Sequence, residues 1–520
     1  MSNTFIISKH VTKEAVLDFV YNRKSYISIK LDDELINKTT NSRRNFEKLI
    51  ENNVPIYGVT TGFGESCFRA IDKENSELLQ KNLVDYLSCG TGKELTPEVS
   101  RAIFLLRLIS LSKGYSGVSI ELINRMVTYL ENDWLPIIPC EGSLGASGDL
   151  IPLAYLAQII QGNGKVYAND QVQNISILLN EKNLKPYKLK SKEGLALVNG
   201  TSAMAGLALT NLSHISYLYE TSVLCTAWLC LVLKGRTEAY DVLVNQKAKD
   251  SLGQAKTATM VKKLIDEEEY KSKNLSTIQT KDNYTCDFIQ DPYSMRCTPQ
   301  ILGPVYDTIE LFGSWLGHEI NGVSDNPLID ENGNLANGGN FYGGYISHGM
   351  DYLKICLAHI ADQMDRQLTL LISDKTNRGL TPNLINWPDN NSERHLHHGL
   401  KGLHQLGSAI TSEIIAKSMP NGVFSRSSES HNQDKVSLGM SAACQCTEVI
   451  DKVYNLFSAY LICLAQAVDL REIKFKGRTS KEMYSKIRSC TGFVDKDTRL
   501  DGALQKLSTE LKQLAKIRNN

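Results

Sequence analysis

The spacing of apolar residues along the chain predicts a largely helical protein. Apolar positions recur every three or four residues over short segments at first and over much longer ones from residue 202 onward. Two short apolar runs, 5–7 and 26–29, are typical of strands. The expected helices cover 15–21, 43–50, 76–88, 97–113, 120–131, 150–160, 202–234, 256–272, 299–319, 347–374, 400–419 and 434–470.

The longest of these helices would extend roughly 55 Å at 1.5 Å per residue, and helices of such length usually pack as an antiparallel bundle. We therefore expect a mainly α fold, with a long antiparallel bundle over 202–520 and a smaller mixed N-terminal region over 1–201. Asn, Asp, Gly and Pro gather in the loops 290–299, 324–344 and 419–433. Functional residues tend to lie on such loops when a rigid frame holds them.

Composition narrows the possible partners and the compartment. Lys plus Arg and Asp plus Glu number 57 each, so bulk charge predicts neither a nucleic acid nor an anionic membrane as a partner. The 12 cysteines form no C-x-x-C pair, which favours reduced intracellular thiols. The N-terminus lacks a signal-peptide pattern. The longest apolar run, 223–233, is too short to span a bilayer and contains Thr226. A cytoplasmic location is expected.

One glycine-rich stretch, 142–150, stands out for its chemistry. Glycines occupy every third position from 142 to 148 and flank Ser147, and such a backbone allows close approach of neighbouring atoms. The amide nitrogen of Gly148 can attack the carbonyl carbon of Ala146. Loss of water, including the Ser147 hydroxyl, then leaves a five-membered ring with an exocyclic methylene, an electrophile that no ordinary side chain supplies. The alternative is a common Gly-rich loop that caps a helix.

Residues 142–154, Gly-Ser-Leu-Gly-Ala-Ser-Gly-Asp-Leu-Ile-Pro-Leu-Ala, resemble the prosthetic-group segment of the aromatic amino acid ammonia-lyases. That family contains histidine, phenylalanine and tyrosine lyases and related aminomutases. The resemblance implies that Ala146-Ser147-Gly148 matures on its own into 4-methylideneimidazol-5-one (MIO), with no metal required. It also implies a homotetramer whose active sites draw on several chains.

The loop 57–64, Tyr-Gly-Val-Thr-Thr-Gly-Phe-Gly, is similar to the mobile inner loop of that family. By resemblance, Tyr57 removes the β-proton of the substrate and Gly64 belongs to the substrate site. A phenol has a pKa near 10, about three units too high for a base at neutral pH. Helix N-termini or a cation would therefore have to lower the pKa of Tyr57. A half-buried loop aromatic is the alternative.

Two further segments carry polar groups that suit an amino acid substrate. Asn199 precedes a long expected helix, where it could simply cap that helix, but by resemblance it binds the MIO carbonyl region and the substrate. Arg296 can clamp a carboxylate with two hydrogen bonds, although a lone arginine more often forms a surface ion pair. The resemblance implies that Arg296 binds the α-carboxylate, that Tyr293 lies close to the MIO, and that Gln290 supports them.

The remaining matches lie in the last two polar loops. By resemblance, Asn326 contacts the substrate carboxylate and Phe341 lines the prosthetic pocket. In the segment His-Asn-Gln-Asp, Asn432 is either a binding residue or a helix cap. Gln433 stands where histidine-specific members carry a glutamate, so its neutral amide disfavours an imidazole substrate.

The pair Tyr86-Leu87 is expected to meet the substrate ring. Histidine lyases typically place a histidine at the second position, many tyrosine lyases place one at the first, and phenylalanine lyases often have Phe-Leu. The Tyr86 hydroxyl either fills space beyond an unsubstituted ring or donates a hydrogen bond to a para-hydroxyl. We expect phenylalanine first, tyrosine second and histidine third.

These features predict a non-oxidative elimination that converts L-phenylalanine or L-tyrosine to trans-cinnamate or p-coumarate and ammonia. Two alternatives stay open: an aromatic 2,3-aminomutase on the same scaffold, and a non-catalytic helical scaffold. A metal site is the weaker interpretation of one further cluster, because its polar loop lacks a Cys or carboxylate ligand pattern. That cluster comprises His395, His397, His398 and His404.

Overall fold

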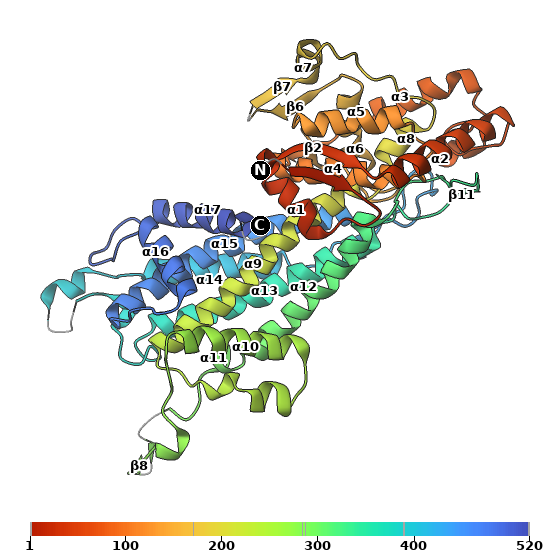
Figure 1. Cartoon of the computed structure of the whole chain (residues 1–520). Coiled ribbons are helices and arrows are strands. Elements are labelled where there is room, and N and C mark those ends of the chain that lie inside the picture. Colours follow the sequence, from red (N-terminus) through yellow and green to blue (C-terminus); the bar gives the residue numbers. More distant parts are fainter. Residues whose placement is uncertain (1–2, 170, 283, 286–287, 388–390, 518–520) are drawn as a thin grey trace.

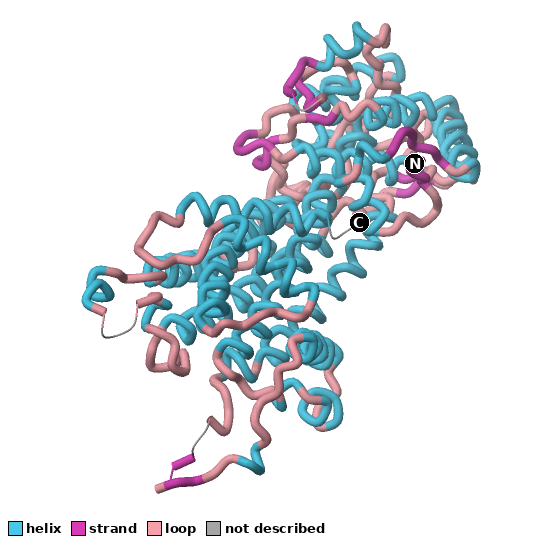
Figure 2. The backbone as a smooth tube through the Cα atoms, turned by 60° about the vertical axis from the view of Figure 1, so that its left-hand side comes forward, coloured by secondary structure: helices cyan, strands magenta, loops and turns pink. Residues whose placement is uncertain are grey.

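The computed structural model describes residues 3–169, 171–282, 284–285, 288–387 and 391–517. Long helices form an elongated bundle, and a smaller region of short helices and strands lies at one end of it (Figures 1 and 2). This confirms the predicted fold class. One continuous hydrophobic core runs from Phe5 in the first strand to Ala515 in the last helix.

The N-terminal region alternates short helices with small sheets. β1 pairs with β2 in parallel, β3 with β5 antiparallel, and β4, β6 and β7 form a three-stranded sheet. Side-chain caps at Thr12, Thr96 and Ser119 begin three of the helices. The elements are β1 Asn3–Ile7, α1 Lys13–Tyr21, β2 Tyr26–Leu31, α2 Asp33–Glu51, α3 Ser76–Leu87, β3 Thr91–Glu94, α4 Pro97–Ser112, α5 Ile120–Glu131, β4 Leu135–Pro136, β5 Pro139–Glu141, α6 Leu150–Ile160, β6 Lys165–Ala168, β7 Gln171–Asn174, α7 Ile175–Glu181 and α8 Glu193–Val198.

The bundle is built on α9, α12, α13 and α15. α9 and α13 pack against each other and against both α12 and α15, and α14 packs on α13 and α15. Two short hairpins, β8–β9 and β10–β11, interrupt it. Its elements are α9 Ser202–Val232, α10 Leu252–Glu267, β8 Thr280–Lys281, β9 Tyr284–Thr285, α11 Tyr293–Arg296, α12 Thr298–Asn321, β10 Leu328–Ile329, β11 Leu335–Ala336, α13 Gly344–Ile372, α14 Lys401–Ala416, α15 Gly439–Leu470, α16 Arg478–Cys490 and α17 Asp501–Ile517.

The direction of the bundle helices decides where the functional loops meet. Just before α9, the Thr201 hydroxyl donates to Glu319 near the end of α12 over 2.9 Å, so these two helices are antiparallel. The N-termini of α9, α13 and α15 meet, since an added Cβ at Gly343 or at Gly439 would lie 2.4 Å or 2.5 Å from the Met204 sulfur. Three helix starts therefore gather at the end of the bundle that faces the N-terminal region.

Most helix boundaries follow the predictions closely, but several differ. α10 covers Leu252–Glu267 where 256–272 was expected. α2 starts at Asp33, ahead of the expected 43. α15 starts at Gly439 instead of 434, because Leu438 is left-handed with φ 56° and its N–H pairs with the Leu144 carbonyl over 3.2 Å. Its 32 residues extend about 48 Å. α7, α8, α16 and α17 were not predicted. The last two bury a narrow apolar stripe that includes Leu507.

Two helices are unusually apolar for their length. α9 and α15 would each be long and apolar enough to cross a membrane by length and composition. However, 89% and 83% of the residues in their most apolar windows are buried inside the protein. Segments that are apolar on every side belong in a large core, and the most apolar parts of both helices lie there.

Candidate active site

One cavity of about 960 Å³ gathers most of the predicted site residues. It lies between the inner loop, α3, the glycine-rich stretch, and the loops around 326–342 and 428–435. The predicted residues that line it are Tyr57, Gly64, Tyr86, Leu87, Ala146, Ser147, Gly148, Asn199, Asn326, Phe341, Asn432 and Gln433. Segments far apart in sequence therefore meet around Ser147.

The glycine-rich stretch adopts a backbone that requires its glycines. Gly145 and Gly148 have φ of +68° and +72°, values that L side chains rarely adopt. A Cβ at Gly148 would also lie 2.2 Å from the carbonyl oxygen of Gly200. The next residue, Asp149, donates its N–H to that same oxygen over 2.8 Å. The turn at Gly200 thus presses directly against the Ser147-Gly148 segment.

Two side-chain amides hold Ser147. Asn199 Nδ2 donates to the Ser147 carbonyl over 2.8 Å, and Gln433 Nε2 donates to the Ser147 hydroxyl over 3.2 Å. Asn199 Oδ1 is buried and has no hydrogen-bond partner in the described part of the chain. A buried unpaired acceptor is costly, and it marks a place where a donor group is expected. Amide donors and a side-chain-free Gly148 fit a cyclised, carbonyl-bearing group at this position.

A buried acid lies directly after the tripeptide. Asp149 accepts hydrogen bonds from the Ser143 hydroxyl over 2.8 Å and from the Met204 N–H over 2.7 Å. Burial raises the pKa of Asp149 to about 7, despite these donors. Its two oxygens tie the glycine-rich stretch to the first turn of α9.

Helix N-termini surround the tripeptide. α6 begins at Leu150, two residues after Gly148, and α9 begins at Ser202, two residues after Gly200. The starts of α13 and α15 meet α9 at Met204. Each helix N-terminus carries about half a positive charge, so this arrangement places positive potential beside Ser147.

The predicted role of a base required a lowered pKa for Tyr57, but within a single chain its surroundings raise it. The Gly64 N–H donates to the Tyr57 hydroxyl oxygen over 2.8 Å, which favours the phenolate. Burial is the larger effect, however, and with the nearby Glu429 it raises the pKa of Tyr57 above its ordinary value. Lys435 also lines the cavity, but burial outweighs any positive charge near this phenol.

Sequence reasoning missed one acidic residue of the pocket, Glu429. It lines the cavity, accepts a hydrogen bond from the Glu65 N–H over 2.9 Å, and accepts another from Asn432 Nδ2 over 3.0 Å. Its backbone is left-handed, with φ 50°. A carboxylate here can hold a cationic amine or accept a proton. Its position in the polar loop 419–433 was the only signal in the sequence.

Three residues predicted for this site, Gln290, Tyr293 and Arg296, lie elsewhere in a single chain. None of them is among the residues that line the cavity. α11, which contains Tyr293 and Arg296, lies at the opposite end of the molecule from α3 and α6 (Figure 1). The reason is that α11 directly precedes α12, whose first turn lies at the far end of the bundle. There Arg296 stacks on the ring of Tyr293 at 4.6 Å, and Tyr293 is 70% exposed.

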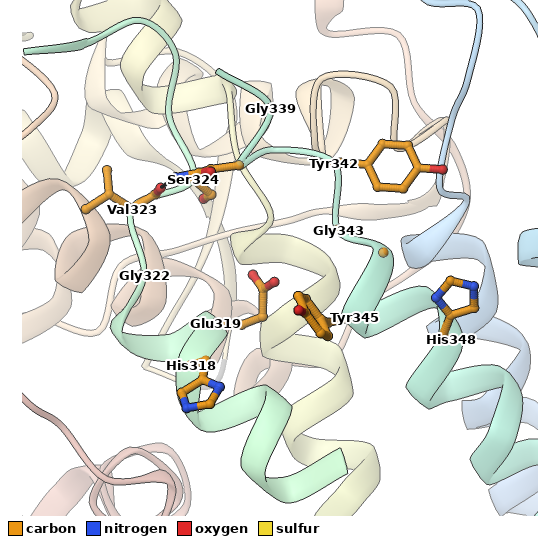
Figure 3. Close-up of a pocket in the computed structure, with 12 residues that line it drawn as sticks. His318, Glu319, Gly322, Val323, Ser324, Gly339, Tyr342, Gly343, Tyr345 and His348 are labelled. Carbon is orange, nitrogen blue, oxygen red and sulfur yellow. Dashed lines mark hydrogen bonds between the residues drawn. The ribbon is translucent and has the colours of Figure 1, made fainter. Parts of the chain in front are cut away.

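A second cavity, of about 470 Å³, borders the first and shares Gly339 and Tyr342 with it. Figure 3 shows Glu319 and Tyr345 facing it, with His318 and His348 on neighbouring helices. Burial raises the pKa of Glu319, whose carboxylate accepts the Thr201 hydroxyl. This cavity lies behind the Asn199–Thr201 turn.

The histidine cluster at 395–404, considered above as a metal site, makes hydrogen bonds within the protein instead. The Asp497 carboxylate accepts the N–H groups of His398 and Gly399, and His404 pairs with the Thr369 hydroxyl over 3.1 Å. Within the described ranges, no group of three or more His, Cys, Asp or Glu side chains is arranged to hold a metal ion.

Comparison with known proteins agrees with the fold and the pocket. Residues 12–489 match the family described as aromatic amino acid lyase. Histidine ammonia-lyase from Legionella pneumophila (strain Corby) is 33% identical over 90% of each chain. Phenylalanine aminomutase from Pantoea agglomerans has a TM-score of 0.89, with 30% identity over 98% of this chain and 99% of the other. Tyrosine aminomutase from Streptomyces globisporus has a TM-score of 0.88, with 28% identity over 99% of this chain and 98% of the other.

The fold is a bundle of long helices, and at one end of it two side-chain amides hold the turn that contains Ser147. Together with these matches, this arrangement defines a carbon–nitrogen lyase. More specifically, the chain belongs to the aromatic amino acid lyase family, whose relatives here include ammonia-lyases.

Proposed function

We propose that this enzyme deaminates L-phenylalanine or L-tyrosine to trans-cinnamate or p-coumarate and ammonia. The observation that carries the proposal is the chemistry of two pocket residues, Leu87 and Gln433. Where histidine-specific members of the family typically place a histidine and a glutamate, this chain has an apolar side chain and a neutral amide. An unsubstituted or phenolic ring loses little on leaving water for such a wall, whereas an imidazole leaves polar nitrogens unpaired.

We also propose that Ala146-Ser147-Gly148 matures into MIO. The donors from Asn199 and Gln433, the unpaired Asn199 Oδ1 and the tight backbone at Gly148 support this. When formed, the group supplies an electrophile that turns the substrate amine into a leaving group. The surrounding helix N-termini favour negative charge on it.

Tyr57 is the proposed acceptor of the β-proton. Its hydroxyl oxygen faces the same cavity as Ser147 and receives the Gly64 N–H at 2.8 Å, which stabilises the phenolate. Asn326 is positioned by the Gly338 N–H, which donates to its Oδ1 over 2.8 Å, and it is the proposed carboxylate contact from this side of the pocket.

The second carboxylate contact, Arg296, has to come from another copy of the chain. In one chain α11, which ends at Arg296, lies at the far end of the bundle, so a shared site in a homotetramer accounts for the predicted role of Arg296. Mixing inactive Tyr57→Phe and Arg296→Ala variants under conditions of subunit exchange should restore part of the activity. Lack of recovery in hetero-oligomers that have demonstrably formed would contradict shared sites.

An aromatic 2,3-aminomutase is the second candidate, because solved relatives of similar fold are a phenylalanine and a tyrosine aminomutase. Histidine elimination is the third, since curated relatives at 32–33% identity are named histidine ammonia-lyases. Steady-state rates with L-phenylalanine, L-tyrosine and L-histidine, with products identified, separate them. A β-amino acid as the main product, or histidine as the best substrate, would overturn the proposal.

Ser147→Ala serves as the control for these measurements. It should abolish elimination together with the near-ultraviolet band of the mature group. In the wild type, the peptide that contains 146–148 should have lost two waters by mass, and an intact Ser147 there would refute the maturation.

A further inference from the structure

A buried arginine lies behind the tripeptide, outside the pocket. Arg107 is on α4, an otherwise largely apolar helix, and it is 0% exposed. Its Nη2 donates to the carbonyl of Asn199 over 2.8 Å and also to the carbonyl of Ala196. Nε and Nη1 have no hydrogen-bond partner among the residues that the structure describes. Burying a guanidinium costs several kcal/mol, so its retention at this position calls for a reason.

The guanidinium of Arg107 binds the carbonyl groups of Ala196 and Asn199. They lie at the C-terminal end of α8, where carbonyl groups carry partial negative charge that favours a cation. Burial lowers the pKa of Arg107 to about 10, which leaves the group charged at neutral pH. Of its nearest acids, Asp325 is already paired with Lys192 over 2.6 Å. Arg107 therefore binds backbone rather than a partner carboxylate.

That backbone is the turn that shapes the tripeptide. A Cβ at Gly200 would lie 2.3 Å from Arg107 Nη1, so the guanidinium packs directly on this glycine. On the other side, the Gly200 carbonyl accepts the Asp149 N–H and touches Gly148. The neighbouring Asn199 donates its side-chain amide to the Ser147 carbonyl. The Asn199–Gly200 peptide is thus clamped between Arg107 and the Ser147-Gly148-Asp149 segment.

We infer that Arg107 is a positioning residue for maturation of the tripeptide. By fixing the Asn199–Gly200 peptide it keeps the Asn199 amide on Ser147 and presses Gly148 toward Ala146. In the maturation, a bond forms between the Gly148 nitrogen and the Ala146 carbonyl carbon, and two waters leave. This inference rests on the proposed function, because it assigns a residue to the formation of its prosthetic group.

The test compares Arg107→Met and Arg107→Lys with a matched control on the same helix. Arg101 is also buried, 8% exposed, and it pairs with Asp133 over 2.7 Å on a face remote from the pocket. Arg101→Met should lower the thermal unfolding midpoint but leave maturation complete. Arg107→Met should lower the yield or rate of the two-water loss at 146–148 at least about tenfold. Arg107→Lys keeps the positive charge and should recover part of the lost maturation.

A soluble, cooperatively unfolding Arg107→Met variant with full maturation would overturn the inference. If Arg107→Met does not fold, the Arg107→Lys variant provides the test. If Arg107→Lys matures as completely as Arg101→Met, the inference is also overturned. Hydrogen exchange of peptide 143–150 provides a second measurement that needs no prosthetic group. Exchange should be faster in either Arg107 variant than in Arg101→Met, because the Asp149 N–H loses its fixed acceptor, and equal exchange would refute the positioning. An unmodified wild-type Ser147 would instead refute the proposed function, and exchange would still test the positioning.

Discussion

Replacing Lys192 with Met breaks an ion pair that is wholly buried beneath the pocket. Lys192 Nζ lies 2.6 Å from Asp325 Oδ2, and both side chains are 0% exposed. Asp325 Oδ1 also accepts the N–H of Asn326, which lines the pocket. The pair thus links the start of α8 to the loop of the proposed carboxylate contact. Burial lowers the pKa of Lys192 from its ordinary value, which shows the cost of the charge there.

The size of the effect follows from desolvation. Removing one member of a buried pair leaves an uncompensated charge and typically costs about 3–5 kcal/mol. With about 2.1 cal/mol/K of unfolding entropy per residue, a chain of 520 residues has about 1.1 kcal/mol/K. Lys192→Met or Asp325→Asn should therefore each lower the midpoint by about 3–5 °C. The double variant removes both charges and should return to within about 2 °C of the wild type.

The assay is thermal unfolding at one fixed scan rate, followed by far-ultraviolet circular dichroism. Lys262→Met is the control, since Lys262 pairs with Asp266 at 2.6 Å one helical turn away on the surface of α10. An exposed pair of this kind contributes about 0.3–0.5 kcal/mol, so the control should shift the midpoint by less than about 1 °C. Single variants that shift no more than the control, or a double variant that equals the sum of the singles, would refute the reasoning.

Three further predictions concern the pocket and the acid stability. Tyr57→Phe should lower kcat by about 10²–10⁴ while the near-ultraviolet band persists, and an unchanged kcat would remove Tyr57 as the base. Gln433→Glu should lower kcat/KM for phenylalanine by about tenfold or more and raise the preference for histidine, whereas an unchanged ratio of the two substrates would exclude Gln433 from ring selection. Burial, aided by Lys516, lowers the pKa of His214 to about 4, so the stability from its neutral form is present above pH 6.5 and is lost as the pH falls toward 4. His214→Gln should flatten the fall of the unfolding midpoint between pH 6.5 and 4, and parallel curves for variant and wild type would contradict this.

Much of the fold and of the site could be predicted from local sequence patterns. Apolar periodicity located the long helices because the helix repeat is a property of neighbouring residues. Motif spacing found the tripeptide, Tyr57, Asn199 and Gln433, and the structure places all of them around one cavity. Glu429 was not predicted because its direction into the pocket depends on left-handed backbone at three successive residues, 429–431. The local sequence does not predict that conformation.

The sequence by itself determined the helical class, the glycines that free the 142–148 backbone, and the set of polar groups near Ser147. Only the tertiary structure decided which helix starts converge on the tripeptide, because α9, α13 and α15 meet through Met204 from distant parts of the chain. It also separated Arg296 from the pocket that its motif predicted, and it brought Arg107 out of an apolar helix onto the turn behind Ser147. The physical reason is that a motif specifies which chemistry a residue can perform, while long-range packing specifies which groups that residue meets.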